Sequence, residues 1–263
     1  MDGATRRRVK WHLSRLRKTV VKERAGSLIR CQDYWVRIND GPNFYMLYKD
    51  LFAHRIYQFE AQRSDPVILD CGSNIGMSIL FFKKLYPDAR VLGFEPDPRI
   101  FPYLQENIAL NRLQGVELFQ AAVAAQEGSL TLYSDGKYGS FLGEGLPAEP
   151  TGGWVKYTVP CVRLRDYLNG PVDFLKLNIE GAEYSVLADS ADRLRCVREL
   201  VLEYHHLPEL PRTLHRILAL LHDAGFEYLV NDFDGETNAG VRPPFCLTPE
   251  TRYYLLVYAR RLD

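Results

Sequence analysis

The chain has 263 residues, of which 46% are hydrophobic and 25% charged, so it can bury the core of one large domain. Its formal net charge is zero, and a chain this apolar with so little net charge is not expected to be disordered. It has no apolar run of about 18 residues, so no membrane-spanning helix is expected. Five scattered cysteines and the lack of a signal-like N-terminus are typical of a reduced, cytoplasmic protein without structural zinc.

The first 24 residues carry nine Lys and Arg against two acids, a net charge of +7 that leaves −7 on the rest of the chain. We predict a helix over residues 5–24. Such a basic arm can contact phosphate, a membrane surface or a partner subunit, as in a homo-oligomer. The alternative, which the weak specificity of basic runs favours, is a solvated helix whose apolar side chains pack on the body.

Residues 27–38 alternate as in a strand, and residues 39–42 (NDGP) predict a turn. Residues 43–60 are rich in aromatic side chains, and we expect a short strand there, followed by a helix. Residues 1–60 are therefore predicted to form a basic helix and cap that lead into a main domain at residues 61–263.

From Pro66 onward, short apolar segments alternate with segments whose apolar residues recur at helical spacing. This alternation predicts parallel strands joined by helices in a doubly wound α/β sheet. The predicted strands are residues 67–70, 90–94, 116–120, 129–133, 154–162, 172–179 and 199–204. The predicted helices are residues 75–86, 98–111, 182 onward and 214–224. Residues 135–153 are rich in Gly and Pro and predict a loop over the site.

The last two predicted strands, residues 226–230 and 252–260, are joined by a segment without a helical pattern. They should be antiparallel, because a parallel pair needs a longer crossover. An antiparallel strand that ends a parallel sheet resembles the sheet of methyltransferases that use S-adenosylmethionine (SAM), and ordinary dehydrogenase domains usually lack it.

The segment Asp70–Gly76 (DCGSNIG) follows a strand and opens a helix, where glycines let the backbone approach a ligand. It begins with an acid and has two glycines, so it departs from the GxGxxG fingerprint of pyrophosphate binding. The acid would instead attract the ammonium of the SAM methionine moiety. Glu95 ends the next strand, where an acid accepts hydrogen bonds from both ribose hydroxyls, and Pro96 follows it.

The candidate cofactor-binding residues are Asp70, Cys71, Gly72, Ser73, Asn74, Gly76, Glu95, Pro96, Ala122 and Asn178. We interpret Cys71 as a small packing residue, because no partner base is near it in the sequence.

Four segments, residues 67–76 (VILDCGSNIG), 93–96 (GFEP), 106–111 (ENIALN) and 173–183 (DFLKLNIEGAE), resemble the FkbM-type methyltransferase family. The resemblance implies a Rossmann-like class I methyltransferase fold with SAM as cofactor. Its sheet would be mostly parallel and seven-stranded, with an antiparallel C-terminal strand. The family further implies O-methylation of a hydroxyl on a sugar, glycolipid or polyketide-type product. Asn178 stands where the family usually has Asp, so it offers hydrogen bonds without a charge.

Ligands bind at the carboxyl ends of parallel strands, and two neighbouring predicted strands end in polar residues. The candidate catalytic residues there are Asn178, Glu180, Glu203, His205 and His206, with Glu183 beside them. Methyl transfer from a sulfonium requires the enzyme to align the acceptor and remove its hydroxyl proton. His205 or His206 is the predicted base, since histidine titrates near neutrality, and Glu180 or Glu203 would orient the imidazole or hold an acceptor hydroxyl.

These residues have other interpretations. Tandem histidines can belong to a satisfied turn, and Glu180 can cap the following helix. Carboxylates, an amide and imidazoles can hold a divalent ion, although the charge lost at Asn178 disfavours a metal. Lys176 either lines the core or reaches an acid in the cleft, and residues 139–142 either touch the acceptor or form a plain loop.

Three rival functions remain at this point. A nucleic-acid methyltransferase would use the basic arm, but the Asn/Asp-Pro-Pro-aromatic turn of base methylation is absent and the body is acidic. A nicotinamide-dependent oxidoreductase is disfavoured by the leading Asp70 and the missing third glycine. A non-catalytic protein that keeps the fold is the third, because Asn178 departs from the family pattern.

Overall fold

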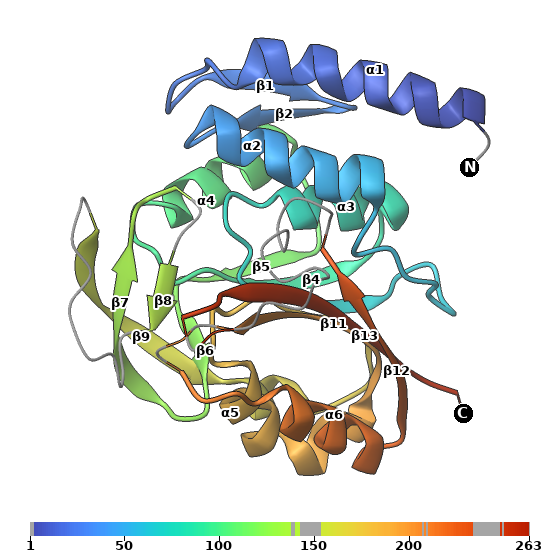
Figure 1. Cartoon of the computed structure of the whole chain (residues 1–263), viewed down its shortest axis with the longest axis vertical. Coiled ribbons are helices and arrows are strands. Elements are labelled where there is room, and N and C mark those ends of the chain that lie inside the picture. The colour runs from blue at the N-terminus through green and yellow to red at the C-terminus, as the bar shows by residue number, and fades with distance from the viewer. Residues whose placement is uncertain are drawn as a thin grey trace.

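The computed structural model describes residues 3–137, 140–142, 154–206, 208, 210–233, 248 and 250–262. An N-terminal cap packs on a seven-stranded sheet that carries helices on both faces, and a four-stranded sheet stands beside it (Figure 1). Within these ranges, no helix has both the length and the apolar character needed to cross a membrane.

The cap begins with helix α1 (Gly3–Val20), which confirms the predicted basic helix. The single strand expected over residues 27–38 is wrong, because the structure has a hairpin of β1 (Leu28–Cys31) and β2 (Tyr34–Arg37). Gln32 lies between the two strands with a left-handed φ of 55°, and an Asn-Gly signal that would have announced this turn is absent.

The short strand expected within residues 43–60 is also wrong. Helix α2 (Gly41–Tyr48) runs directly into a π-helical turn (Lys49–His54). Asp40 caps α2 by accepting a hydrogen bond from the backbone N–H of Asn43 at 3.0 Å, and proline occupies the first turn of the helix. The turn predicted at residues 39–42 is thus the start of a helix.

The main sheet has the order β12–β13–β11–β10–β3–β4–β5, and β13 is antiparallel to both neighbours. The other pairs in this sheet are parallel, so the predicted mostly parallel seven-stranded sheet with an antiparallel C-terminal strand is confirmed. The strands are β3 (Val67–Cys71), β4 (Arg90–Phe94), β5 (Val116–Phe119), β10 (Val172–Leu177), β11 (Val197–His206), β12 (Phe226–Asp232) and β13 (Tyr253–Arg261).

The two faces of the sheet bury two separate cores, because side chains alternate along each strand. Ile68 and Phe174 pack with the cap and with α3 (Met77–Leu85) and α4 (Phe101–Leu110). Their strand neighbours Leu69 and Leu175 pack on the opposite face with α5 (Glu183–Asp189) and α6 (Leu214–Asp223). Two short 3₁₀ helices, Leu164–Tyr167 and Ala191–Cys196, complete that second layer.

The cap shares the first of these cores. Phe44 is fully buried in it, and the ring of Phe59 stacks on Phe174 of β10 with centroids 4.3 Å apart. Gly41 lies so close to the end of α1 that an added Cβ would stand 2.1 Å from the carbonyl oxygen of Val20. The boundary at residue 60 stays a prediction, but the packing of the cap is continuous with the body.

The second sheet has the order β6–β9–β7–β8. It consists of β6 (Ala122–Ala124), β7 (Gly128–Ser134), β8 (Ser140–Leu142) and β9 (Val155–Arg163). Strand β8 lies inside the stretch 135–153 that was expected to be a loop, so that expectation is wrong for residues 140–142. Gly139 and residues 143–153 lie outside the described residues.

Candidate functional site

The turn of residues 70–76, here called the cofactor turn, leaves the carboxyl end of β3 and enters α3. Gly72 has a φ of 88°, and an added Cβ would lie 1.9 Å from the carbonyl oxygen of Asn178, so no other residue fits. Gly76 caps α3 with a φ of 90°, and its missing side chain leaves room for Leu104. The two glycines therefore serve the close packing of the turn between β10 and α4.

The carboxylate of Glu95 joins the cofactor turn to the end of β4. Its Oε2 accepts a hydrogen bond from the backbone N–H of Asn74 at 2.8 Å, and its Oε1 accepts one from Asp97 at 2.9 Å. Burial raises the pKa of Glu95 to about 7, although these two backbone donors oppose the shift. A carboxylate has about four acceptor positions, so lone pairs remain for two further donors.

Asp70 is fully buried, and its carboxylate is already paired in this structure. Ser78 donates a hydrogen bond to Asp70 Oδ2 at 2.5 Å, and Lys176 Nζ lies 3.1 Å from Oδ1. Lys176 also donates to the carbonyl oxygens of Gly72 and Cys71. Of the two interpretations of Lys176, lining the core or reaching an acid, the structure shows that it reaches the acid Asp70. The ion pair joins β10 to the cofactor turn.

The cap reaches the cofactor turn through two buried asparagines. Asn43 Nδ2 lies 3.1 Å from Asn39 Oδ1, 3.3 Å from Asn74 Oδ1 and 3.1 Å from the carbonyl oxygen of Lys137. Asn39 Nδ2 donates to the same Lys137 carbonyl at 2.8 Å. Asn74 itself has a left-handed φ of 47°, so this network supports a strained residue in the turn.

Asn178 follows β10 and faces the cofactor turn. Its backbone N–H donates to the carbonyl of Cys71 at 3.0 Å, while its side-chain Oδ1 is buried and has no hydrogen-bond partner among the described residues. A buried acceptor without a donor is costly, so this atom is suited to a ligand that donates a hydrogen bond.

The other predicted cofactor residues lie in the cofactor turn, beside Glu95 or, for Ala122, in the second sheet. Ser73 is buried and donates to the carbonyl of Asp70 at 3.0 Å. Cys71 is fully buried, and burial raises the pKa of its thiol, which suits a packing residue and not a nucleophile. Pro96 is half-buried beside Glu95, and Ala122 lies in β6, where it pairs with Cys161.

A histidine between two acids occupies the carboxyl ends of β10 and β11. His205 Nε2 lies 3.5 Å from Glu180 Oε2, and His205 Nδ1 lies 3.3 Å from Glu183 Oε1. Burial lowers the pKa of His205, but the carboxylates of Glu180 and Glu183 outweigh it and raise the pKa to about 10. Burial raises the pKa of Glu180 to about 7, against the attraction of His205.

Glu180 is the most open member of this group, with 27% of its side chain exposed against 2% for Glu183. It has a left-handed φ of 54°, which is rare for a residue with a side chain, and Gly181 follows with a φ of 103°. Gly181 donates its backbone N–H to Glu183 Oε1 at 3.1 Å. The strained backbone holds the Glu180 carboxylate at the rim of the sheet beside His205.

Glu203 lies on the same face of β11 as His205, and its partner comes from the cap. Tyr57 donates a short hydrogen bond from its hydroxyl to Glu203 Oε1, and both residues are buried. Lys176 Nζ lies 5.7 Å from the centre of the Tyr57 ring. Burial raises the pKa of Glu203, against the attraction of Lys176. Tyr57 lies outside every sequence motif, so only the packing of the cap reveals it as a partner of Glu203.

His206 points to the other face of β11. It is 2% exposed, and its ring lies 4.5 Å from that of Tyr253 on β13. The structure therefore brings Asn178, Glu180, Glu203 and His205 together and leaves His206 apart from them. Successive side chains of a strand point to opposite faces of the sheet, so the sequence already implied that His205 and His206 cannot both face the site.

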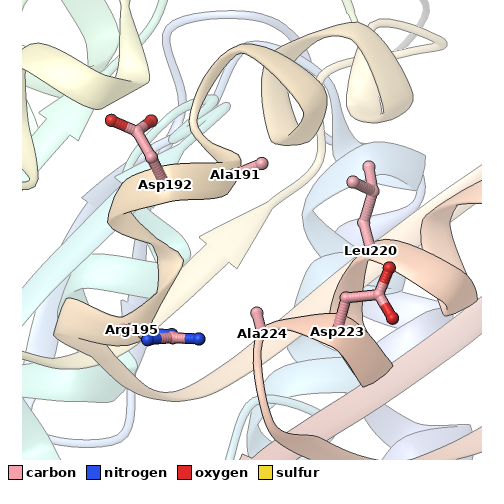
Figure 2. A pocket seen from close by; sticks show the side chains of 6 residues that line it. All are labelled: Ala191, Asp192, Arg195, Leu220, Asp223 and Ala224. Carbon is pink, nitrogen blue, oxygen red and sulfur yellow. The ribbon is translucent and has the colours of Figure 1, made fainter.

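Among the described residues, no group of three His, Cys, Asp or Glu has the arrangement of a metal site. A cavity of about 390 Å³ lies between the 3₁₀ helix Ala191–Cys196 and α6, lined by Asp192, Arg195 and Asp223 among others (Figure 2). These elements directly precede β11 and β12, so the cavity lies at the amino ends of those strands. The group of Glu180, Glu183 and His205 lies at the opposite, carboxyl ends of β10 and β11.

The strand order and the polar carboxyl edge define the class of proteins to which this fold belongs, that of SAM-dependent methyltransferases. M. jannaschii TYW2, solved in complex with AdoMet, superimposes with a TM-score of 0.50 over 91% of this chain and 88% of its own, at 14% sequence identity. An identity this low supports the fold alone.

The methyltransferase FkbM domain matches residues 70–228, well over half of the chain. The chain therefore belongs to the FkbM methyltransferase family, which confirms the resemblance seen in its motifs.

Several relatives cover most of the chain. Methyltransferase sdnD of Sordaria araneosa is 32% identical and covers 69% of this chain and 81% of its own. The 2-O-methyltransferase NoeI of Sinorhizobium fredii is 30% identical and covers 65% of this chain and 77% of its own. The 31-O-demethyl-FK506 methyltransferase FkbM of Streptomyces tacrolimicus is 29% identical and covers 68% of this chain and 80% of its own.

Proposed function

We propose that this protein is an O-methyltransferase that uses SAM to methylate a hydroxyl of a sugar, glycolipid or polyketide-type small molecule. Two relatives whose names describe O-methylation support the reaction type. The observation that carries the proposal is the partly exposed Glu180 carboxylate beside His205, at the carboxyl edge of the sheet next to the cofactor turn.

The residues of the cofactor turn fit SAM. The remaining lone pairs of Glu95 suit the two hydroxyls of a ribose, and the unpaired Asn178 Oδ1 suits an ammonium or amide donor. Asp70 Oδ2 is engaged by Ser78, whereas Asp70 Oδ1 is ion-paired with Lys176 and accepts no hydrogen bond among the described residues, so Oδ1 is the atom that would accept one from the ammonium of the methionine moiety. When bound, SAM supplies an electrophilic methyl group on a positively charged sulfur.

We assign removal of the acceptor proton to Glu180 and not to a histidine. With a pKa of about 10, His205 is an imidazolium at neutral pH and has no free lone pair with which to accept a proton. A Glu180 carboxylate with a pKa of about 7 is matched to this task, because the ideal base titrates near the working pH. His205 then serves as a positioning residue that holds the carboxylate from one side.

Glu203 and Tyr57 complete the proposed site from the cap side. Their hydrogen bond places a buried polar pair beside Lys176, and it connects the cap to the strand that carries His205. Alignment of the acceptor oxygen with the methyl group can supply about 7–11 kcal/mol, and a positioned base adds about 10²–10⁴-fold. The proposed mechanism uses no metal ion.

The test is methyl transfer from SAM carrying a labelled methyl group to a panel of hydroxylated acceptors, with products identified by mass spectrometry. We expect a mass gain of one methyl on an oxygen of a sugar, glycolipid or polyketide-type acceptor, at a rate about 10²–10⁴-fold lower when Glu180→Gln replaces the native protein. Transfer to nitrogen or carbon, or to nucleic acid alone, would contradict the proposal.

A further inference from the structure

Helix α1 presents a basic face that the methyltransferase site does not use. The helix has no acidic residue, whereas seven of its residues are Lys or Arg. It packs on the cap through Leu13, Leu16 and the buried Val20, which recur at helical spacing. Its position is fixed further by His12 Nε2, which lies 3.1 Å from the hydroxyl of Tyr48 on α2.

The opposite face of α1 combines an aromatic ring with positive charge. Trp11, Arg15 and Lys18 are spaced four and three residues apart, so they project in one direction, and all three are exposed. Trp11 is 62% exposed, and the guanidinium of Arg15 lies 5.7 Å from the centre of its ring. An exposed indole next to cations suits the headgroup level of a bilayer, which takes up aromatic rings and positive charge together.

Exposed apolar side chains concentrate in this part of the molecule. Among the described residues, five of the ten large apolar side chains that are exposed lie within residues 11–46, which are a small part of the chain. They are Trp11, Val21, Leu28, Trp35 and Met46. Phosphate binding requires only the cations, whereas a lipid surface also takes up indole and aliphatic groups at the headgroup level. The exposed indole of Trp11 on the cationic face of α1 therefore favours a lipid surface over a nucleic acid.

We propose that the outer face of α1 docks on an anionic phospholipid surface. Arg15 and Lys18 face the headgroups and Trp11 enters the interface, while the net charge of +7 in residues 1–24 against −7 in the rest of the chain favours this end of the molecule for an anionic surface. Helix α1 lies at the end of the molecule opposite to α5 and α6 (Figure 1), so a docked protein leaves those helices clear of the surface. The protein binds peripherally, through charge and one indole, and does not span the bilayer.

The test is co-sedimentation of the full chain with vesicles of phosphatidylcholine, either pure or with about 30% phosphatidylserine. We expect binding only to the anionic vesicles, and release between about 0.1 M and 1 M salt, because screening shortens from about 10 Å to about 3 Å. Arg15→Glu combined with Lys18→Glu should weaken binding at least about tenfold, and Trp11→Ala should weaken it less while removing the blue shift of tryptophan emission.

The matched control carries the same change of charge on the far side of the molecule, Arg212→Glu with Arg216→Glu at the start of α6. It should bind vesicles like the native protein, and circular dichroism of all variants verifies the fold. Equal binding to both vesicle types, or equal loss in the control, overturns the proposal. Salt-dependent binding to RNA without binding to anionic vesicles also overturns it and assigns α1 to a nucleic acid.

Discussion

At the scale of single residues, the site depends on how burial and neighbouring charges set protonation. Glu180 and His205 titrate as a coupled pair, in which the carboxylate and the imidazolium coexist between about pH 7 and about pH 10. Below this window the Glu180 carboxylate is protonated and cannot serve as the proposed base. His205 loses its charge above the window and no longer holds Glu180.

The rate of methyl transfer should therefore rise as the pH increases through about 7 and fall again above about 10. Glu180→Gln should lower kcat by about 10²–10⁴-fold and remove the rising limb, with little effect on the affinity for SAM. The measurement is kcat at saturating SAM across this range. A native profile in the Glu180→Gln variant would contradict the assignment of the base.

Gly72 is the position in the cofactor turn where an added side chain meets the closest backbone contact. Gly72→Ala places a Cβ 1.9 Å from the Asn178 carbonyl at a φ of 88°, so we expect a loss of at least about 2 kcal/mol in the free energy of unfolding. Urea denaturation measures it. Gly170→Ala is the control, because an added Cβ there meets nothing within 4 Å, and similar losses in both variants would be evidence against this account.

Residue types and spacing were enough to predict the turn after β3, Glu95 and the acidic group after β10 as candidates for the site. They did not single out Glu180 as the proposed base, since the protonation of Glu180 and His205 depends on their distance across two strands. Tyr57 could not be found either, because it meets Glu203 only through the packing of the cap. Asp70 was identified, but its pairing with Lys176 and Ser78 requires the fold.

At the scale of elements, α2 acts on the cofactor turn through Asn43. Asn43→Ala removes the donor to Asn39 Oδ1 and one of the two donors to Asn74 Oδ1 and to the Lys137 carbonyl, which costs about 1–3 kcal/mol. Because Asn74 belongs to the turn, we also expect weaker binding of S-adenosylhomocysteine, measured by titration calorimetry.

Asn111→Ala is the matched control for the change at Asn43. Asn111 also joins the cap to the body, by hydrogen bonds of 2.9 and 2.7 Å to the backbone of Trp35, but on α4 and away from the turn. It should lower stability and leave the affinity for S-adenosylhomocysteine unchanged. If both variants lose affinity equally, the effect of Asn43 is merely structural.

The elements of the body follow from hydrophobic periodicity, whereas those of the cap do not. Alternating strands and helices after Pro66 carry their own patterns, so their order and the antiparallel end of the sheet were predictable. The hairpin over residues 28–37 lacks a glycine turn, and the π-helical turn has no distinctive pattern. Strand β8 lies in a Gly- and Pro-rich stretch, where pairing with β7 decides the structure.

At the scale of the whole molecule, cap and body share one hydrophobic core. Removal of residues 1–60 would expose the aromatic face around Phe82 and Phe174, and it would remove Phe59 and Tyr57. We expect residues 61–263 alone to lose the cooperative unfolding transition of the full chain, measured by thermal denaturation with circular dichroism. A truncated chain that melts cooperatively near the native temperature would contradict a shared core.

We propose that SAM binds where the cofactor turn meets Glu95. Titration calorimetry with S-adenosylhomocysteine tests it most directly, because no acceptor need be known. We predict saturable binding at one site, weakened about 10–150-fold in Glu95→Gln, since a hydrogen bond to a charged group contributes about 1.5–3 kcal/mol. Absence of binding, equal affinity in Glu95→Gln, or binding of NAD in its place would contradict the claim.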